Sequence, residues 1–269
     1  MPCIDAVGNV HRRADANARI VSLVPSITEL LFTLGLAGRV VGRTGFCIHP
    51  RDAIRDVPKV GGTKDVRLDA LRVLKPTHVI VNVDENELDT FETIREFVPN
   101  VIVTHPNAPL DNVVLYRMLG HIFGAEVRAE ELAAELQREL AACTATTWSS
   151  ERVLYLIWKD PWMGVASDTY IARTLACVGW NVIVAPGGWS GAGRYPVISD
   201  IDAAAHAVDR VLLSSEPFMF RQRHVAELRD RLDMPIDLVD GEMTSWYGSR
   251  AIRGLAYLRD FRTSRSAGT

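Results

Sequence analysis

Short apolar runs that alternate with segments of helical period constrain the fold of this chain more than any other sequence feature. The runs are rich in Val, Ile and Leu, and they cover residues 19–24, 39–44, 78–83, 100–105, 152–158, 181–186, 210–215 and 236–241. Nearly continuous apolar strands separated by amphipathic helices are typical of parallel sheets covered by helices. The sequence therefore predicts an α/β fold.

Two stretches of the chain share one plan, which indicates two lobes. Residues 76–105 and 207–241 each consist of an apolar strand, an acidic or Ser-rich loop, an amphipathic helix and a second strand. A length of 269 residues suits one large or two medium domains. We therefore expect two related α/β lobes, each with a parallel sheet.

The segment between these stretches is expected to be one stiff helix. In residues 128–140 the spacing of Leu132, Leu136 and Leu140 places them on one face of a helix, and the segment contains neither Gly nor Pro. The predicted domains are an N-terminal lobe over 1–126, a connecting backbone helix over 127–148 and a C-terminal lobe over 149–269. Open α/β sheets bind ligands beyond the carboxyl ends of their strands, so we predict a ligand cleft between the lobes.

A helix is also expected over residues 26–36, next to the first strand. Ser26 is followed three positions later by Glu29, the pattern of a capping box at a helix start. Gly35 is expected to end this helix.

Composition and charge narrow the class of protein. Hydrophobic residues make up 48% and charged residues 23%, as in ordinary globular chains, and a net charge of −3 provides no basic field for nucleic acid. No apolar run is long enough to span a membrane, and no secretory signal precedes the first strand. As written, the chain is expected to be cytoplasmic, or periplasmic if a leader has been removed. The four cysteines are far apart and are expected to stay reduced or buried.

Aromatic residues recur in the loops that follow the predicted strands. These residues are Phe46, Trp162, Trp189, Tyr195, Phe218, Trp246 and Tyr247. A single loop aromatic often only covers the core, but a set in corresponding loops favours a flat apolar surface for a large planar or hydrophobic ligand.

Motifs for catalysis or phosphate binding are missing from the sequence. There is no G-x-S-x-G, no P-loop and no H-E-x-x-H. Cys47 and His49 could offer metal ligands from one loop if that loop curls suitably. The acidic residues Asp84, Glu85 and Glu87 could bind a cation, or could simply be solvated and cap the next helix.

The ordered motifs of the chain resemble a known family. They are "DAVGNVHRRADANARIVSLVPSITELLFTLGL", "VVGRTGFCIHP", "VGGTKDVRLDALRVLKPTHVIV", "WKDPWMGVASDTYIARTLACVGWNVI", "RYPVIS", "VLLSSEPFMF" and "DGEMTSWYGSR". Together they resemble the class III substrate-binding proteins of ABC importers, which have a helical backbone, and most closely the cobalamin-binding branch. The resemblance implies two Rossmann-like lobes joined by one long helix, with the ligand held between them.

The resemblance also implies roles for individual residues. Phe46, Trp162 and Tyr195 match aromatics that contact the corrin ring, whereas Thr63 stands where the family has another aromatic. The loop residues Phe218, Glu242, Trp246 and Tyr247 complete the predicted ligand-binding set. The family docks to its permease through one acidic residue on each lobe. The matching position in the first lobe is Asp69, and in the second lobe it is Ile201, which stands between Asp200 and Asp202.

These inferences predict a binding protein without catalytic activity. Its expected ligand is cobalamin or a related corrinoid, its possible partner is an ABC permease, and it is expected to be a monomer. A ferric siderophore or haem is the alternative ligand, with Lys64, Lys159 and Arg194 as the cations available to an anionic chelate and His49 as an axial ligand. A second alternative is an enzyme that modifies a corrinoid or metal cofactor, with Asp84, Glu216 or Glu242 as acid or base.

Overall fold

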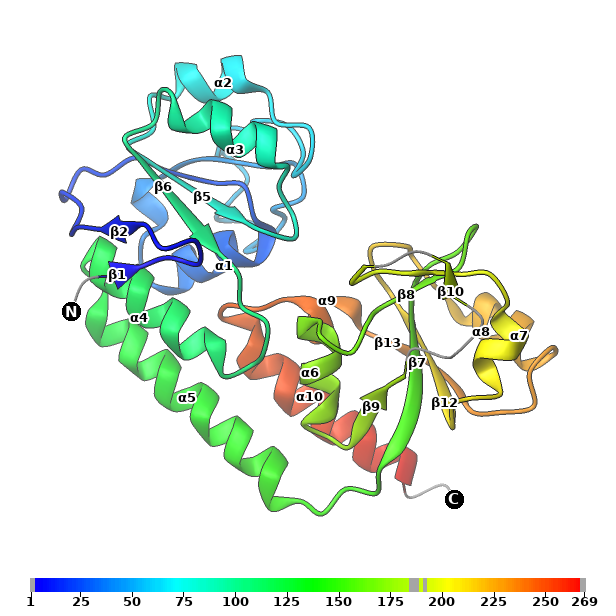
Figure 1. Cartoon of the computed structure of the whole chain (residues 1–269). Coiled ribbons are helices and arrows are strands. Elements are labelled where there is room, and N and C mark those ends of the chain that lie inside the picture. The colour runs from blue at the N-terminus through cyan, green and yellow to red at the C-terminus, as the bar shows by residue number, and fades with distance from the viewer. Residues whose placement is uncertain (1–2, 184–188, 191–192, 267–269) are drawn as a thin grey trace. The chain divides into compact units, whose positions relative to one another are not determined.

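The computed structural model describes residues 3–183, 189–190 and 193–266 (Figure 1). The chain forms two compact units. The N-terminal unit comprises Met1–Pro106, Asp111–Leu136 and Tyr247–Arg250, and the C-terminal unit comprises Asn107–Leu110, Gln137–Trp246 and Ala251–Thr269. The long helix α5 (Glu126–Ala145) supplies residues to both, since the division falls between Leu136 and Gln137.

The sheet of the N-terminal unit is parallel and has the strand order β4-β3-β5-β6. Its strands are β3 (Ile20–Ser22), β4 (Val40–Arg43), β5 (His78–Asn82) and β6 (Asn100–Thr104). The helices of this unit are α1 (Pro25–Thr33), η1 (Ala37–Arg39), α2 (Leu68–Val73), α3 (Leu88–Arg95) and α4 (Asp111–Phe123). Helices α2 and α3 lie on one side of the sheet, and α1 and α4 lie on the other (Figure 1).

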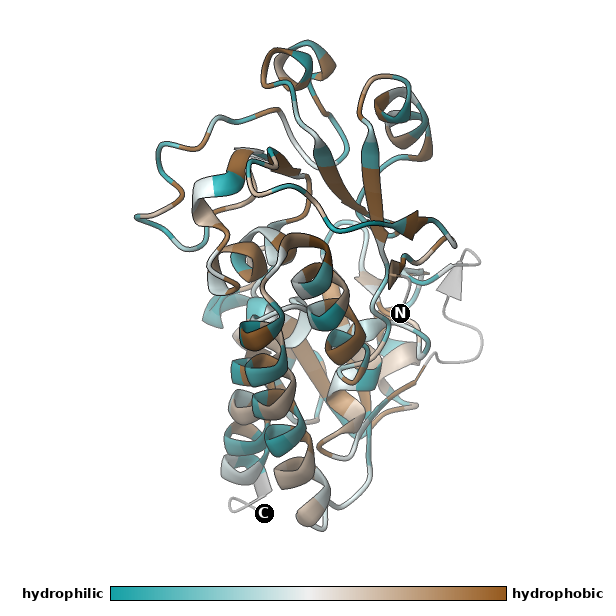
Figure 2. Cartoon of the chain, turned by 90° about the vertical axis from the view of Figure 1, so that its left-hand side faces the viewer, coloured by the Kyte–Doolittle hydropathy of each residue, from teal (hydrophilic) through white to brown (hydrophobic). Residues whose placement is uncertain are grey.

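The apolar runs form these strands because both faces of the sheet are covered. All five residues of β5 are buried, and Val79 and Val81 pack with Leu71 of α2 and Ile94 of α3. The strands of this sheet are hydrophobic over most of their length, whereas the helices carry residues of both kinds (Figure 2). The predicted parallel α/β fold is confirmed in this unit.

The start of α1 differs from the sequence prediction. The helix begins at Pro25, and its N-cap residue is Val24, which makes no side-chain cap. Proline is favoured at the first helical position because its missing N–H is not needed there and its φ is already helical. The predicted capping box was therefore wrong: Ser26 lies inside the helix, and Glu29 instead accepts two hydrogen bonds from Arg250 at 2.8 Å.

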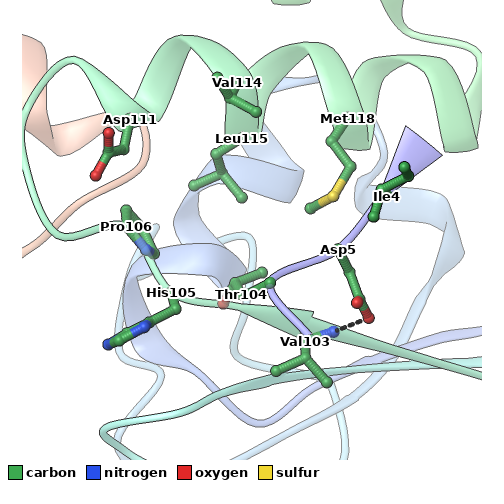
Figure 3. Close-up of a pocket in the computed structure, with 11 residues that line it drawn as sticks. Ile4, Asp5, Val103, Thr104, His105, Pro106, Asp111, Val114, Leu115 and Met118 are labelled. Carbon is green, nitrogen blue, oxygen red and sulfur yellow. Dashed lines mark hydrogen bonds between the residues drawn. The ribbon is translucent and has the colours of Figure 1, made fainter. Parts of the chain in front are cut away.

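A short N-terminal hairpin covers the free edge of β6. Its strands are β1 (Cys3–Ile4) and β2 (Val10–His11), paired antiparallel. The amide of Ala6 donates to the carbonyl of Val103, and the amide of Val103 donates to the Asp5 carboxylate, each at 3.0 Å (Figure 3). The edge strand thus has hydrogen-bond partners that an open edge would lack.

The sheet of the C-terminal unit is mixed. Its order is β10-β11-β8-β7-β12-β13, with β9 also paired to β7. Strands β7 (Glu151–Trp158), β9 (Trp180–Val182), β12 (Arg210–Ser214) and β13 (Ile236–Val239) are parallel, and β8 (Met163–Gly164), β10 (Trp189–Ser190) and β11 (Val197–Ile198) are antiparallel. The helices are α6 (Tyr170–Ala176), α7 (Ile201–Ala205), α8 (Gln222–Arg229), α9 (Gly241–Ser245) and α10 (Arg250–Ser266).

The internal similarity seen in the sequence corresponds to one repeated unit of structure. Residues 76–105 form β5, α3 and β6, and residues 207–241 contain β12, α8 and β13. In both, the two strands pair in parallel with the helix between them. The strand expected over 181–186 corresponds to β9, which ends earlier, at Val182, and residues 184–186 lie outside the described residues.

Candidate functional site

The loop after β4 presents apolar side chains at the carboxyl end of the N-terminal sheet. Phe46 is 63% exposed, and Ile48 is exposed as well. Phe46 lies against the backbone of Gly62, from the loop that precedes α2. The same loop holds Thr63, which is half-buried, so the structure brings Phe46 and the Thr63 loop together. These residues form a surface suited to a flat apolar partner.

Cys47 points away from this surface. Its side chain is 0% exposed, and its Sγ lies 3.1 Å from the hydroxyls of both Thr28 and Thr44. Burial raises the pKa of the thiol, which opposes formation of the thiolate that binds metals. His49 is half-buried in the same loop. Among the described residues, no group of three or more His, Cys, Asp or Glu side chains could hold a metal ion.

The loop after β5 is fixed by asparagine side chains. The amide of Asn82 donates to Oδ1 of Asn86, and Nδ2 of Asn86 donates to the carbonyl of Thr63, each at 2.8 Å. Asn86 therefore ties the strand end to the Thr63 loop. Asp84 lies 3.4 Å from Nε2 of His105, which follows β6. Sequence reasoning did not identify Asn86, and only its place after a strand could have indicated it.

Tyr247 belongs to the N-terminal unit, although it lies near the end of the chain. Its side chain is 7% exposed, and its hydroxyl donates to Oε1 of Glu85 at 2.6 Å. Burial raises the pKa of this hydroxyl, and the negative Glu85 raises it further. The tyrosine therefore presents little of its ring to solvent and holds the acidic loop after β5.

An aromatic cluster lies at the carboxyl end of the C-terminal sheet. We call the side chains of Trp158, Trp162, Phe218 and Phe220 the aromatic platform. The rings of Trp158 and Phe218 meet edge to face at 5.7 Å, and those of Phe218 and Phe220 lie 4.7 Å apart. Trp162 stacks on Phe220 at 6.0 Å with parallel planes. The cluster thus joins the end of β7 to the loop after β12.

The platform combines buried and exposed members. Phe220 is buried, and Trp162 and Phe218 pack on the same core while keeping part of their surface open. Trp158 is 40% exposed, and Met219, which follows Phe218 in the sequence, is exposed too. Trp158 was missed as a site residue because it ends an apolar strand, where an indole is expected to join the core. Its position as the last residue of β7 was the available signal.

Trp246 and Glu242 come from the segment after β13. Both are half-buried, and Nε1 of Trp246 donates to Oε1 of Glu216 at 2.8 Å. Tyr195, the remaining aromatic of the predicted set, is exposed in the segment just before β11. The side chain of Trp189 lies outside the described residues. The structure therefore brings Trp162 and Phe218 together in this unit and places Trp246 beside Glu216.

The cations near these loops are paired with acids of the same chain. Lys159 donates to Glu227 at 2.7 Å and lies over the ring of Trp162, and Lys64 is 3.4 Å from Glu87. Arg194 donates to Oδ1 of Asn107 at 2.7 Å and also lies 3.8 Å from Asp168. Partnered cations have less to offer an anionic ligand than open ones.

The predicted docking residues differ between the two units. Asp69 is exposed in the first turn of α2. In the second unit Ile201 is buried, the Asp200 side chain caps α7, and Asp202 accepts two hydrogen bonds from Arg231 at 2.6 and 2.7 Å. The acids beside Ile201 are thus already bonded within the chain, and docking through Asp69 stays a prediction.

Family comparison identifies the class of protein. The chain belongs to the periplasmic binding protein family, which matches residues 20–230. It is a substrate-binding protein of the ABC-importer type, so the predicted class is confirmed. Members of this family are solute-binding proteins. In the described part of the chain, no helix is both long and apolar enough to cross a membrane, and the expected compartment stays a prediction.

Individual relatives are named for two kinds of ligand. The vitamin B12-binding protein of Vibrio parahaemolyticus is 22% identical over 209 residues, which cover 77% of this chain and 71% of that protein. The periplasmic vitamin B12 binding protein BtuF of Vibrio cholerae superimposes with a TM-score of 0.77 at 15% identity, over 93% of this chain and 98% of that protein. The periplasmic heme-binding protein RhuT of Roseiflexus sp. RS-1 superimposes with a TM-score of 0.71 at 23% identity, over 92% of this chain and 97% of that protein.

Proposed function

We propose that this protein binds cobalamin or a related corrinoid, without catalysis, and delivers it to an ABC permease. The observation that supports this best is the aromatic platform at the carboxyl end of the C-terminal sheet. A corrin has a methyl-rich ring, and apolar area removed from water contributes roughly 25 cal/mol per Å². Exposed apolar residues at the strand ends of the N-terminal unit, Phe46 and Ile48, offer further surface of the same kind.

The charge pattern favours a ligand with an uncharged periphery. Lys64, Lys159 and Arg194 each have an acidic or amide partner within the chain. A ligand with free carboxylates would have to compete for these cations, whereas the amides of a corrinoid need only hydrogen-bond partners such as Glu242. Uncharged amide groups thus match the loops better than the propionates of haem or an anionic siderophore.

Haem or a ferric chelate is the second candidate. The likeness to a heme-binding structure supports it, and half-buried His49 lies in the loop that carries Phe46. A haem iron would require an axial ligand, which His49 could supply. If His49 instead bound the cobalt of a corrinoid, the visible spectrum of the bound corrinoid would change.

The test is a calorimetric titration with cyanocobalamin, recorded together with the visible spectrum, and repeated with haem and a ferric siderophore. One site of micromolar affinity or better for cyanocobalamin, and weaker binding of the other two, is expected. Tight binding of haem or the siderophore with no heat from cyanocobalamin would reject the proposal. Sedimentation velocity on the same sample tests the expected monomer.

The site itself is tested by removing two indoles. Trp162→Ala combined with Trp246→Ala is expected to weaken cyanocobalamin binding at least 100-fold, since each buried aromatic contact contributes on the order of 1–3 kcal/mol. Trp148→Ala serves as the control, because this indole donates to the Cys143 carbonyl and precedes the start of β7, whereas the aromatic platform lies at the end of that strand. Unchanged affinity in the double variant would reject this assignment of the site.

A further inference from the structure

Glu216 makes contacts that its sequence position does not suggest. It follows β12, and its Oε1 accepts hydrogen bonds from both Oγ of Ser245 at 2.7 Å and Nε1 of Trp246 at 2.8 Å. An indole N–H is a single donor of fixed direction, so the bond defines the orientation of the whole ring system. The carboxylate therefore connects the loop after β12 to the end of α9.

The backbone on both sides of this contact is closely packed. The amide of Gly241, the first residue of α9, donates to Oγ of Ser215 at 2.8 Å, and Oγ of Ser214 donates to the carbonyl of Glu216 at 2.6 Å. A Cβ on Gly241 would overlap both the Ser214 hydroxyl and the Glu216 side chain. Glu216 is thus held by its own loop before it reaches Trp246, so it can act as a fixed support.

The electrostatics of Glu216 agree with a supporting role. Burial raises the pKa of its carboxyl group, the hydrogen bond from Ser245 lowers it, and Glu242 and Asp240 nearby raise it. A half-buried carboxylate in this environment is costly to leave without its donors. The sequence alone had offered Glu216 as an acid or base, but its Oε1 is occupied by two donors of the chain.

We propose that Glu216 is a positioning residue, which fixes the Trp246 indole as one rigid wall of the ligand site. The inference rests on the proposed function, because Trp246 is taken there to contact the ligand. A fixed aromatic ring loses little conformational entropy on binding, so it favours a rigid planar ligand over a flexible one. Specificity for a macrocycle then depends on a carboxylate that does not contact it.

The orientation of Trp246 can be measured without any ligand. The chain contains six tryptophans, and protein labelled with 5-fluorotryptophan allows the Trp246 resonance to be assigned by its loss in Trp246→Phe. Glu216→Ala is expected to shift or broaden this resonance, and Glu216→Gln, which keeps an acceptor oxygen, is expected to leave it sharp. A Trp246 resonance that is unchanged in Glu216→Ala would overturn the proposal.

Binding of cyanocobalamin supplies the second readout. Glu216→Ala is expected to weaken binding roughly tenfold and Glu216→Gln less than about twofold, in line with loss of a half-buried hydrogen bond. In a Trp246→Phe background, where the indole N–H is already absent, Glu216→Ala is expected to weaken cyanocobalamin binding by less than about threefold. Equal losses in the alanine and glutamine variants, or full additivity with Trp246→Phe, would overturn the positioning role. Asp260→Ala, an exposed acid on α10, is the control.

The two proposals fail in different ways. If the wild-type protein does not bind cyanocobalamin, the proposed ligand is wrong, and the fluorine spectrum still decides whether Glu216 fixes the indole. If the wild type binds and the Trp246 resonance is insensitive to Glu216→Ala, the ligand stands and the positioning role is rejected. Thermal melts of each variant show that the fold is intact before either result is interpreted.

Discussion

His78 is a buried histidine that should make the protein sensitive to mild acid. Its Nδ1 lies 2.9 Å from the Thr77 hydroxyl, and its ring meets Phe123 edge to face at 5.2 Å. Burial lowers its pKa to about 4, with a smaller effect from His11. In the unfolded chain the same imidazole has its ordinary pKa near 6.5, so below that pH protonation favours the unfolded state. The stabilising effect of neutral His78 is therefore complete above pH 6.5 and is lost as the pH falls toward 4.

Urea denaturation should reveal this effect. We expect His78 to lower the free energy of unfolding by about 2 kcal/mol between pH 7 and pH 5. His78→Gln should remove that part of the pH dependence, whereas His206→Gln, at an exposed position, should retain it. An identical pH slope in the His78 variant and the wild type would contradict the assignment.

At the residue scale, sequence reasoning located side chains better than it oriented them. Phe46 and Trp162 were expected at strand ends, and they lie there. Cys47 was offered as a ligand because it stands two residues from His49, yet a loop position does not specify direction, and the thiol points toward Thr28. The partner of Tyr247 is Glu85, which is 162 positions away. No local pattern encodes such a pair.

At the element scale, the N-terminal hairpin depends on one carboxylate. Asp5 accepts hydrogen bonds from the amides of Val7, Asn9 and Val103, and its Oδ2 also lies 3.0 Å from both the Asn9 side chain and Nε2 of His11. Burial by itself raises the pKa of Asp5, but these bonds offset burial and lower it to about 2. The hairpin is therefore stabilised above the unfolded pKa near 4, and this stabilisation is lost as the pH falls toward 2.

Asp5→Ala should loosen this hairpin. The change leaves the Val103 amide of the edge strand without its partner, so we expect a loss of about 3 kcal/mol in the free energy of unfolding at pH 7. The matched control is Asp52→Ala, because Asp52 is 97% exposed and pairs only weakly with Arg55, and its loss should stay within about 0.5 kcal/mol. Similar losses in the two variants, measured by urea denaturation, would show that the hairpin is not a stabilising element.

The elements themselves were predictable to different degrees. Long apolar strands such as β5 and β12 were located to within a residue, because burial on both faces leaves a strong pattern. Two-residue strands such as β8 and β11 leave no such pattern, so the antiparallel part of the C-terminal sheet was missed. The start of α1 was misplaced because Pro25 provides the helix start without a side-chain cap.

At the scale of the whole molecule, charge should contribute little to ligand affinity. The net charge is −3, and the cations at the strand ends are paired within the chain. Raising NaCl from 50 to 500 mM should therefore change the Kd for cyanocobalamin less than about twofold, since few charge pairs with the ligand are available for screening. A fivefold or larger loss in the same calorimetric titration would show that cations do hold the ligand.

The four residues from Tyr247 to Arg250 pack with the N-terminal unit, although the chain on either side belongs to the C-terminal unit. Gly248 bonds to Asn112 and Tyr116, and Arg250 bonds to Glu29. During synthesis the N-terminal unit cannot complete these contacts until residue 250 has left the ribosome. The lobe whose sequence is translated first is therefore among the last parts of the protein to finish folding.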